Sequence, residues 1–364
     1  MDKRLHNEEI TPNVVAVKSC LNQDVNSTQC KYEGGILMQA VLVEEESRRL
    51  YIGEHEKPAH GDQELLVKVK ATALNRADLL QRQGGYPPPE GASPILGLEM
   101  AGIVEEVGSD VDGWMPGDRV FGLLSGGGYA EYAAIPAGMA MRVPENLSLE
   151  EAAAIPEVFL TAYMNLFWLG GMKAGHTVLI HAGASGVGTA ATQLVYEAGG
   201  TSITTAGTDE KRAFSRELGA STSIDYKAGP FEPRVREKTD GRGVDIILDF
   251  IGAPYWEQNL KSLAVDGRLV IIGTMGGTKI DGLNLGQLLR RRLQVIGTAL
   301  RSQPGEKKIE LTREFAEFAL PRFEDGCLKP IVDSVWNWQD ANDAQQHMMD
   351  NKNTGKIVLR IGEE

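Results

Sequence analysis

The chain has 364 residues, which suits two domains better than one. Its 50 acidic and 37 basic residues give a formal net charge of −13, which disfavours non-specific binding to nucleic acid or anionic membranes. It has no uncharged apolar run of about 18 residues, no apolar N-terminal signal and only three cysteines, so we expect a cytoplasmic protein without a membrane span or disulfide framework.

Residues 1–37 show no sustained periodicity and end close to the pair Gly34-Gly35. From Met38 the run MQAVLVEE alternates apolar and polar residues as a half-buried strand does. We therefore predict that residues 1–37 are an N-terminal extension or an appended segment and that the fold begins at Met38. An extra element packed on the body is the alternative.

Residues 38–160 contain short strand-like runs separated by glycine, proline and aspartate turns, among them ELLVKVKATAL, GIVEEVG and YAEYAAIP. This pattern predicts a mostly antiparallel β domain. Through residues 161–300 short apolar strands alternate with amphipathic helices, which predicts an α/β domain with a doubly wound parallel sheet. Residues 301–364 carry helices and a closing strand, GKIVLRI, which we expect to return to the first domain.

The stretch HAGASGVGTAA, residues 181–191, follows a buried strand and opens a helix. In that context a glycine motif indicates a dinucleotide-binding loop, whose helix N-terminus favours a pyrophosphate. Ser185 stands where the middle glycine is usual, but it is small and its hydroxyl could add a donor. Glycines that serve helix packing alone are the alternative. The predicted cradle consists of Gly183, Ser185, Gly186, Val187 and Gly188.

The next strand indicates which dinucleotide binds. An NAD enzyme usually ends this strand with an acidic residue about 20 residues beyond the cradle, whereas this chain has Gly207 and Thr208. Glycine leaves room for a 2′-phosphate, and Lys211 and Arg212 follow within one helical turn and can neutralise it. Asp209 lies just past the expected position and suits a helix-capping role. The predicted cofactor is NADPH.

The sequence resembles the zinc-independent quinone oxidoreductases of the medium-chain dehydrogenase/reductase superfamily, and within them the tumour-suppressor-inducible NADPH:quinone oxidoreductase type. The resemblance covers nearly all of residues 38–364 and rests on the cradle, TAGTDEKR, TSIDY, GKIVL and the run ALNRADLLQRQGGYPPPEGASPILGLEMAG. It implies a GroES-like catalytic domain (38–160 and 301–364) and a Rossmann NADPH-binding domain (161–300). It also implies a homodimer, or a tetramer, joined through the edge strand near QVIGTAL.

Zinc-dependent relatives place a cysteine near ALNRAD and a His-Glu pair at LGLEMAG. This chain has Asn75 and Asp78 in the first stretch and Leu98-Glu99 in the second, and its body has only Cys327. A catalytic zinc needs about three protein ligands, so we expect no metal. Without a Lewis acid, alcohol oxidation is poorly served, whereas a quinone or enone accepts a hydride readily once it is oriented. The resemblance therefore implies NADPH-dependent reduction of a quinone or enone substrate.

By the same resemblance, Tyr86 and Asn75 lie beside the nicotinamide. We predict that Tyr86 is a phenolic donor or stacking wall and that Asn75 is an orienting amide; loop packing and strand capping are the alternatives. Further cofactor contacts are implied, each with a core, turn or surface role as its alternative. They are Asn75, Asp78, Thr161, Gly207, Thr208, Lys211, Tyr226, Gly273, Met275, Leu300, Arg301 and Lys356.

Two other functions stay open. An enoyl-thioester reductase would use the same hydride on a conjugated alkene. A non-catalytic NADPH-binding protein is the second, because relatives of the family include lens crystallins that bind nucleic acid. The run Arg290–Arg292 is the only support for it and is more typical of a solvated helix end. His181, in the strand before the cradle, is expected to be a core residue with satisfied hydrogen bonds.

Overall fold

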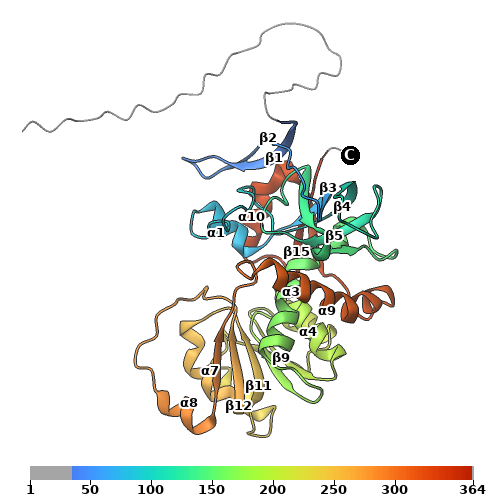
Figure 1. Cartoon of the computed structure of the whole chain (residues 1–364). Coiled ribbons are helices and arrows are strands. Elements are labelled where there is room, and N and C mark those ends of the chain that lie inside the picture. Colours follow the sequence, from blue (N-terminus) through green and yellow to red (C-terminus); the bar gives the residue numbers. More distant parts are fainter. Residues whose placement is uncertain (1–34, 363–364) are drawn as a thin grey trace, which may run out of the picture. The chain divides into compact units, whose positions relative to one another are not determined.

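The computed structural model describes residues 35–362. Nearly all of the predicted extension at residues 1–37 lies outside the described residues, so its role stays a prediction. Residues 37–364 form one unit, built on two large sheets (Figure 1).

The Rossmann sheet has six parallel strands in the order β10-β9-β8-β11-β12-β13. Its strands are β8 (Thr177–Ile180), β9 (Thr201–Ala206), β10 (Thr222–Asp225), β11 (Val244–Asp249), β12 (Leu263–Ile271) and β13 (Gln294–Gly297). The helices between them are α4 (Gly186–Glu197), α5 (Asp209–Glu217), α6 (Glu232–Glu237), α7 (Trp256–Ser262) and α8 (Leu285–Arg291). The order reverses direction between β8 and β11, which is the switch point of a doubly wound sheet. The predicted α/β class is confirmed.

The central strands of this sheet are buried on both faces. Side chains of Val178 and Ile180 enter one core, while Leu179 between them enters a second core on the opposite face. On β12 the neighbours Leu269 and Val270 divide in the same way. Because successive side chains of a strand point to opposite faces, helices must cover both sides, and the strands therefore consist of nearly continuous apolar residues.

The second large sheet has seven strands in the order β14-β15-β3-β4-β5-β7, with β6 paired to β3. Its strands are β3 (Glu64–Ala73), β4 (Glu99–Val107), β5 (Arg119–Leu123), β6 (Tyr132–Pro136), β7 (Ala140–Arg142), β14 (Val332–Asn337) and β15 (Lys356–Arg360). A separate antiparallel pair joins β1 (Leu37–Val43) and β2 (Leu50–Glu56). Helices α1 (Arg76–Arg82), α2 (Leu149–Ala153), α3 (Pro156–Tyr163), α9 (Gly305–Glu324) and α10 (Ala341–Met349) complete the unit.

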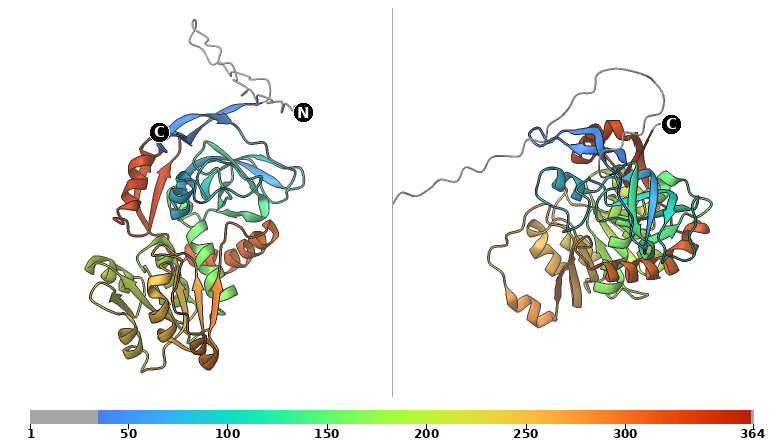
Figure 2. Two further views of the ribbon diagram at one scale, coloured as in Figure 1. Left: turned by 90° about the vertical axis from the view of Figure 1, so that its left-hand side faces the viewer. Right: turned by 45° about the horizontal axis from the view of Figure 1, so that its top comes forward.

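The closing strand β15 joins the β lobe and not the Rossmann sheet. It runs parallel to β14 and antiparallel to β3, with Val358 opposite Ala73 and Leu359 opposite Thr72. In both views of Figure 2, α10 and β15 (red) lie with the blue strands and apart from the yellow and orange sheet. This position brings Lys356, the first residue of β15, next to the end of β3.

Helix α3 is held in place by the aromatic face of α9. The ring of Phe159 lies 5.1 Å from the ring of Phe323 and 6.1 Å from that of Phe315, centroid to centroid. The Phe159–Phe323 pair packs edge to face, which aromatic rings prefer, and the Phe159–Phe315 pair is tilted. These contacts pack α3, whose first turn carries Glu157, against α9.

Candidate active site

The site is built at the carboxyl edge of the Rossmann sheet, where ligands bind in open α/β folds. Many of the predicted residues gather there because they follow the ends of parallel strands. The cradle follows β8, Gly207 and Thr208 follow β9, Tyr226 follows β10, Gly273 and Met275 follow β12, and Leu300 and Arg301 follow β13.

The cradle glycines leave no room for side chains. A Cβ at Gly183 would lie 2.5 Å from the Cβ of Thr204, and one at Gly188 would lie 2.3 Å from the carbonyl oxygen of Ala182. The Ser185 hydroxyl accepts a hydrogen bond of 3.2 Å from the Gly188 N–H and caps α4. Within residues 35–362 its own O–H proton has no acceptor, and its predicted bond to a ligand stays a prediction.

The cradle is completed by the β lobe. The N–H of Gly355 donates to the Ala184 carbonyl at 2.9 Å, and Ser185 and Gly355 form an isolated parallel bridge. A Cβ at Gly186 would lie 2.8 Å from Cδ of Lys356, so the alkyl part of that lysine packs against the helix start. Val187 is partly buried in the first turn of α4. A dinucleotide at this edge would therefore contact both lobes.

The region expected to hold the adenosine is covered by the segment after β10. A Cβ at Gly207 would lie 2.8 Å from the phenolic oxygen of Tyr226 and 3.0 Å from Cε of Lys227. Sequence reasoning missed Lys227, although its place directly after Tyr226 was a usable signal. Lys211 donates to the carbonyl of Asn351 at 2.7 Å, so its ammonium also lies between the lobes.

Arg212 differs from the expectation. Its guanidinium pairs with Asp225 at 3.0 Å and with Asp209, two carboxylates that neutralise its charge. Thr208 caps α5 by accepting a hydrogen bond from the Lys211 N–H at 3.2 Å, so Asp209 is not needed for the cap. Lys227 lies next to Gly207, Lys211 is in the first turn of the helix that follows β9, and neither has a carboxylate within ion-pair distance in residues 35–362.

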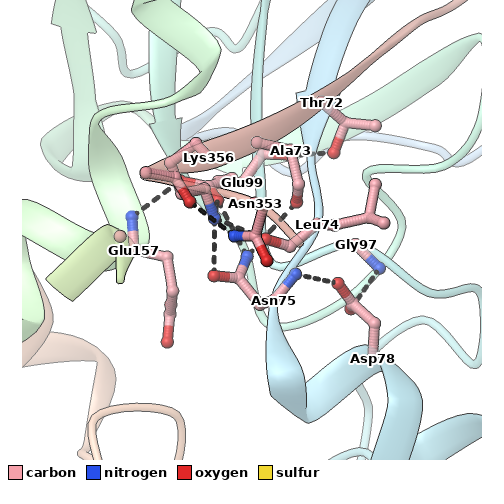
Figure 3. A network of polar contacts seen from close by, with 12 residues as sticks. Thr72, Ala73, Leu74, Asn75, Asp78, Gly97, Glu99, Glu157, Asn353 and Lys356 are labelled. Atoms are coloured by element: carbon pink, nitrogen blue, oxygen red, sulfur yellow. Dashed lines mark hydrogen bonds and ion pairs between the residues drawn. The ribbon is translucent and has the colours of Figure 1, made fainter. Parts of the chain in front are cut away.

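A buried ammonium lies at the zinc-equivalent position, defined here by Asn75, Leu98 and Glu99 (Figure 3). Nζ of Lys356 is 2.6 Å from the Leu74 carbonyl, 2.7 Å from Oδ1 of Asn75 and 2.7 Å from Oε1 of Glu99. The Lys356 side chain is 4% exposed and that of Glu99 is fully buried. Leu98 offers no ligand, and the ammonium already satisfies Glu99, so these residues do not fit a zinc ion. Within residues 35–362, no group of three or more His, Cys, Asp or Glu residues is arranged to bind a metal.

Asn75 and Asp78 are occupied by this network. The Asn75 amide nitrogen donates to Glu99 at 2.8 Å and to a backbone carbonyl, while its oxygen accepts from Lys356. Asp78 is completely buried and accepts from the backbone N–H groups of Asn75 (2.7 Å) and Gly97 (3.1 Å). Burial raises the pKa of Asp78 to about 6. Both residues hold the loop together through these bonds, and their predicted roles as orienting amide and cofactor contact stay predictions.

The acceptor side is formed by Tyr86 and two cations. The Arg301 guanidinium lies 5.2 Å from the centre of the Tyr86 ring and donates to the Ser125 carbonyl at 2.8 and 3.1 Å. The ammonium of Lys308 donates to the Ser125 hydroxyl at 3.1 Å. Burial and the nearby carboxylate of Glu157 raise the pKa of Tyr86. Arg301 is buried and thus lies against the β lobe.

The remaining predicted contacts differ in exposure. Thr161 on α3 and Leu300 are buried, whereas Met275 is 59% exposed. Gly273 donates to the Asp249 carbonyl at 3.2 Å, and Tyr226 is partly exposed. The structure thus brings these residues to one edge of the sheet without testing a cofactor contact.

His181 and the arginine run have structural roles. His181 is buried, its Nε2 lies 2.7 Å from Oδ1 of Asn259, and burial lowers its pKa, which confirms a satisfied core histidine. Arg291 donates to the Leu260 carbonyl at 2.7 Å. Arg292 pairs with Asp266. This arrangement removes most of the support for a nucleic-acid surface at this helix end.

Two family models match the chain. The model described as "Alcohol dehydrogenase GroES-like domain" matches residues 61–145, and "Zinc-binding dehydrogenase" matches residues 186–319. The first covers much of the β lobe and the second much of the Rossmann sheet. Together they agree with the two sheets described above. In residues 35–362 no helix is both long and apolar enough to span a bilayer.

Similar proteins carry oxidoreductase and vesicle-protein names. A rat synaptic vesicle membrane protein VAT-1 homolog is 33% identical over 84% of this chain and 79% of its own length. A bovine quinone oxidoreductase-like protein 2 is 31% identical over 89% and 92%. A mycobacterial structure complexed with NADPH has a TM-score of 0.78 and 32% identity over 89% of this chain and all of that chain. The CurK enoyl reductase structure has a TM-score of 0.78 and 28% identity over 90% and 99%.

Proposed function

Because the chain belongs to the medium-chain dehydrogenase/reductase superfamily, we propose that it reduces quinones, or similar activated carbonyl and enone acceptors, with NADPH and without a metal. One observation carries the metal-free part: the Lys356 ammonium is bonded at the zinc-equivalent position. Alcohol oxidation by relatives that use zinc depends on lowering the pKa of a bound hydroxyl. An electron-poor acceptor needs no such activation, so orientation and exclusion of water suffice.

The residues of the cradle fit a dinucleotide. The exposed N–H groups at the start of α4 and the free O–H proton of Ser185 suit a pyrophosphate. Lys211 and Lys227 next to Gly207 suit a 2′-phosphate, since no acidic residue ends β9. When bound, NADPH supplies a hydride at its nicotinamide ring. Tyr86 and Arg301 would then orient the acceptor, and donors aimed at its oxygen would stabilise the developing negative charge.

The direct test measures NADPH consumption by the purified full chain with 1,2- and 1,4-quinones. We expect turnover with at least one class, tighter binding of NADPH than of NADH, and no stoichiometric zinc by elemental analysis. Cofactor binding without any turnover would favour the non-catalytic alternative. Zinc at one equivalent per chain would contradict the metal-free assignment.

Enoyl-thioester reduction is the second candidate, favoured by the similarity to the CurK enoyl reductase structure. The same hydride would add to an alkene conjugated with a thioester. An acyl thioester should then outcompete small quinones when both are supplied together. Competition kinetics with crotonyl thioesters distinguish the two substrates, since a quinone reductase should show only weak inhibition of quinone reduction by the thioester.

We also propose that two copies pair through β13, the outer strand of the Rossmann sheet. Leu285 and Leu289 on the preceding helix are 64% and 80% exposed, and Val295 on the strand is 38% exposed. An exposed apolar edge strand is a ready template for pairing with another copy.

We place the protein in the cytoplasm, which fractionation of expressing cells can test.

A further inference from the structure

Glu157 is a carboxylic acid that the mechanism above leaves without a role. It lies in the first turn of α3 and is partly buried. Its backbone N–H donates to Oε2 of Glu99 at 2.8 Å, which anchors the residue. Figure 3 shows the side chain directed away from Glu99 and Lys356. Among residues 35–362 its carboxyl oxygens have no hydrogen-bond partner, so the acid is held by its backbone and its oxygens remain available.

The carboxyl group lies close enough to the proposed acceptor side to act on it electrostatically. Once ionised, its charge acts on Tyr86, Arg301 and Lys308, and the two cations both donate hydrogen bonds to Ser125. Arg301 and Lys308 bond only to backbone or hydroxyl oxygens at Ser125 and Tyr86, and neither has a carboxylate within ion-pair distance in the described part of the chain. A polar acceptor between these cations and the carboxyl group would therefore meet both positive charge and an acid.

Burial raises the pKa of this carboxyl group and so favours its protonated form. The pKa of Glu157 is raised to about 8, first by burial and next by the negative charge of Glu99, with a smaller contribution from Asp78. Lys356 and Arg301 act in the opposite direction without cancelling the effect. An acid whose pKa lies close to the working pH is well suited to donate a proton and to be protonated again afterwards.

We propose that Glu157 is a catalytic residue that donates the proton to the oxygen of the reduced acceptor. This inference rests on the proposed quinone or enone reductase function. Tyr86 is the other acid nearby, but its pKa is raised from an already high value, which makes it a weaker proton donor at neutral pH. Tyr86 is left with the task of orienting the acceptor.

The step balances in atoms and charge. The acceptor takes up a hydride, with two electrons, from the dinucleotide, which is thereby oxidised, and the acceptor is left with one anionic oxygen. The O–H bond of Glu157 breaks, a new O–H bond forms on that oxygen, and the electron pair stays on the carboxylate. Water returns a proton to Glu157 before the next turnover, so each cycle consumes one proton.

The test compares Glu157→Gln with the wild type over a range of pH. We expect kcat/KM of the wild type to fall above about pH 8, as the acid ionises. The variant should lose about 10²-fold of kcat/KM at neutral pH and should lack this alkaline decline. The loss should shrink for quinones whose hydroquinones are stronger acids, because their products need less help from a proton donor. A merely structural role would not produce this dependence.

Glu306→Gln is the matched control, because Glu306 also occupies the second position of a helix, α9, but is exposed. It should leave rate and pH profile unchanged, and both variants should bind NADPH as the wild type does. If Glu157→Gln fails to fold, Glu157→Asp carries the test: it keeps the acid and should be slower but retain an alkaline decline. Loss of that decline in Glu157→Asp would overturn the proposal.

An infrared titration of the protein without cofactor gives a readout independent of activity. Difference spectra between pH values record the C=O stretch of protonated carboxyl groups, and a band that disappears near pH 8 should be present in the wild type and absent from Glu157→Gln. Absence of that band from the wild type, or normal kcat/KM in Glu157→Gln, overturns the inference alone. Absence of quinone and enone turnover in the wild type overturns the proposed function as well.

Discussion

At the scale of single residues, three positions decide what the site can do: Gly207, Lys356 and Glu157. The space beside Gly207, which has no side chain, is occupied by the Tyr226 hydroxyl and the side chain of Lys227. Lys356 places a positive charge at the zinc-equivalent position that the family resemblance implies, and Glu157 is the proposed acid of the acceptor side. Gly207 acts by lacking a negative charge, and Lys356 and Glu157 act through their own ionisable groups. Burial strengthens such electrostatic effects.

Gly207 controls the choice of dinucleotide. Gly207→Asp should weaken NADPH binding by at least about tenfold, because a carboxylate at the end of β9 repels a 2′-phosphate and suits ribose hydroxyls instead. Titrations of NADPH and NADH monitored by tryptophan fluorescence measure both affinities. Gly207→Ala controls for crowding against Tyr226 and Lys227, since it adds the Cβ without the charge. Equal effects of the two substitutions would refute the electrostatic explanation.

Lys356 and Glu99 form a buried ion pair, and we expect the substitution of either partner alone to destabilise the protein. Lys356→Met should lower the free energy of unfolding by about 3–5 kcal/mol, because the Glu99 carboxylate is left buried and uncompensated. Adding Glu99→Gln to Lys356→Met should recover part of that loss. Denaturant unfolding curves of the two variants measure the difference, and a double variant no more stable than the single would count against this explanation.

The raised pKa of Glu157 also links stability to pH. Its pKa is raised from 4.5 to about 8 on folding, so the folded state binds the proton more tightly. The stabilisation of the folded state by this tighter proton binding is fully present below pH 4.5 and is lost as the pH rises through about 8. The melting temperature of the wild type should therefore fall, relative to that of Glu157→Gln, as the pH rises between these values. A difference between the two proteins that does not vary with pH would show that the carboxyl group ionises normally.

At the scale of elements, the strand-turn-helix unit around the cradle depends on its glycines more than on its serine. Gly188→Ala should destabilise the protein by about 1–3 kcal/mol and impair dinucleotide binding, because its Cβ meets the backbone of Ala182. Ser185→Gly restores the usual fingerprint; it removes a helix cap, which costs a few tenths of a kcal/mol, and one proposed donor to the pyrophosphate. Denaturant unfolding and NADPH titration of both variants test this contrast. Similar losses in the two would contradict it.

At the scale of the whole molecule, the outer strand β13 is expected to join two copies. Val295→Asp should shift the protein toward monomers in sedimentation experiments, because a charge at the centre of an apolar edge opposes pairing. Val335→Asp is the control, since Val335 is 42% exposed on β14, the edge strand of the other sheet. A change in mass for Val335→Asp but not for Val295→Asp would contradict this prediction, because it would show that the interface involves β14 and not β13.

The local features of this protein were predictable from its sequence. The cradle, the strand before it and the helix after it are contiguous, and the alternation of apolar strands with amphipathic helices is a repeated local pattern. The parallel sheet and the β lobe follow from such patterns because backbone hydrogen bonds and burial impose them over short stretches. Leu98 likewise shows in the sequence alone that a zinc ligand is missing.

Only the tertiary structure decided how distant charges pair. Lys356 reaches Asn75 across 281 positions in the chain, Arg212 is neutralised by Asp225, and Glu157 lies close enough to Arg301 for their charges to interact. No local pattern encodes these contacts, because electrostatic energies depend on distance in space and on burial. The sequence therefore determined which cofactor-binding fold forms, while long-range packing determined which of its charged residues remain free to act.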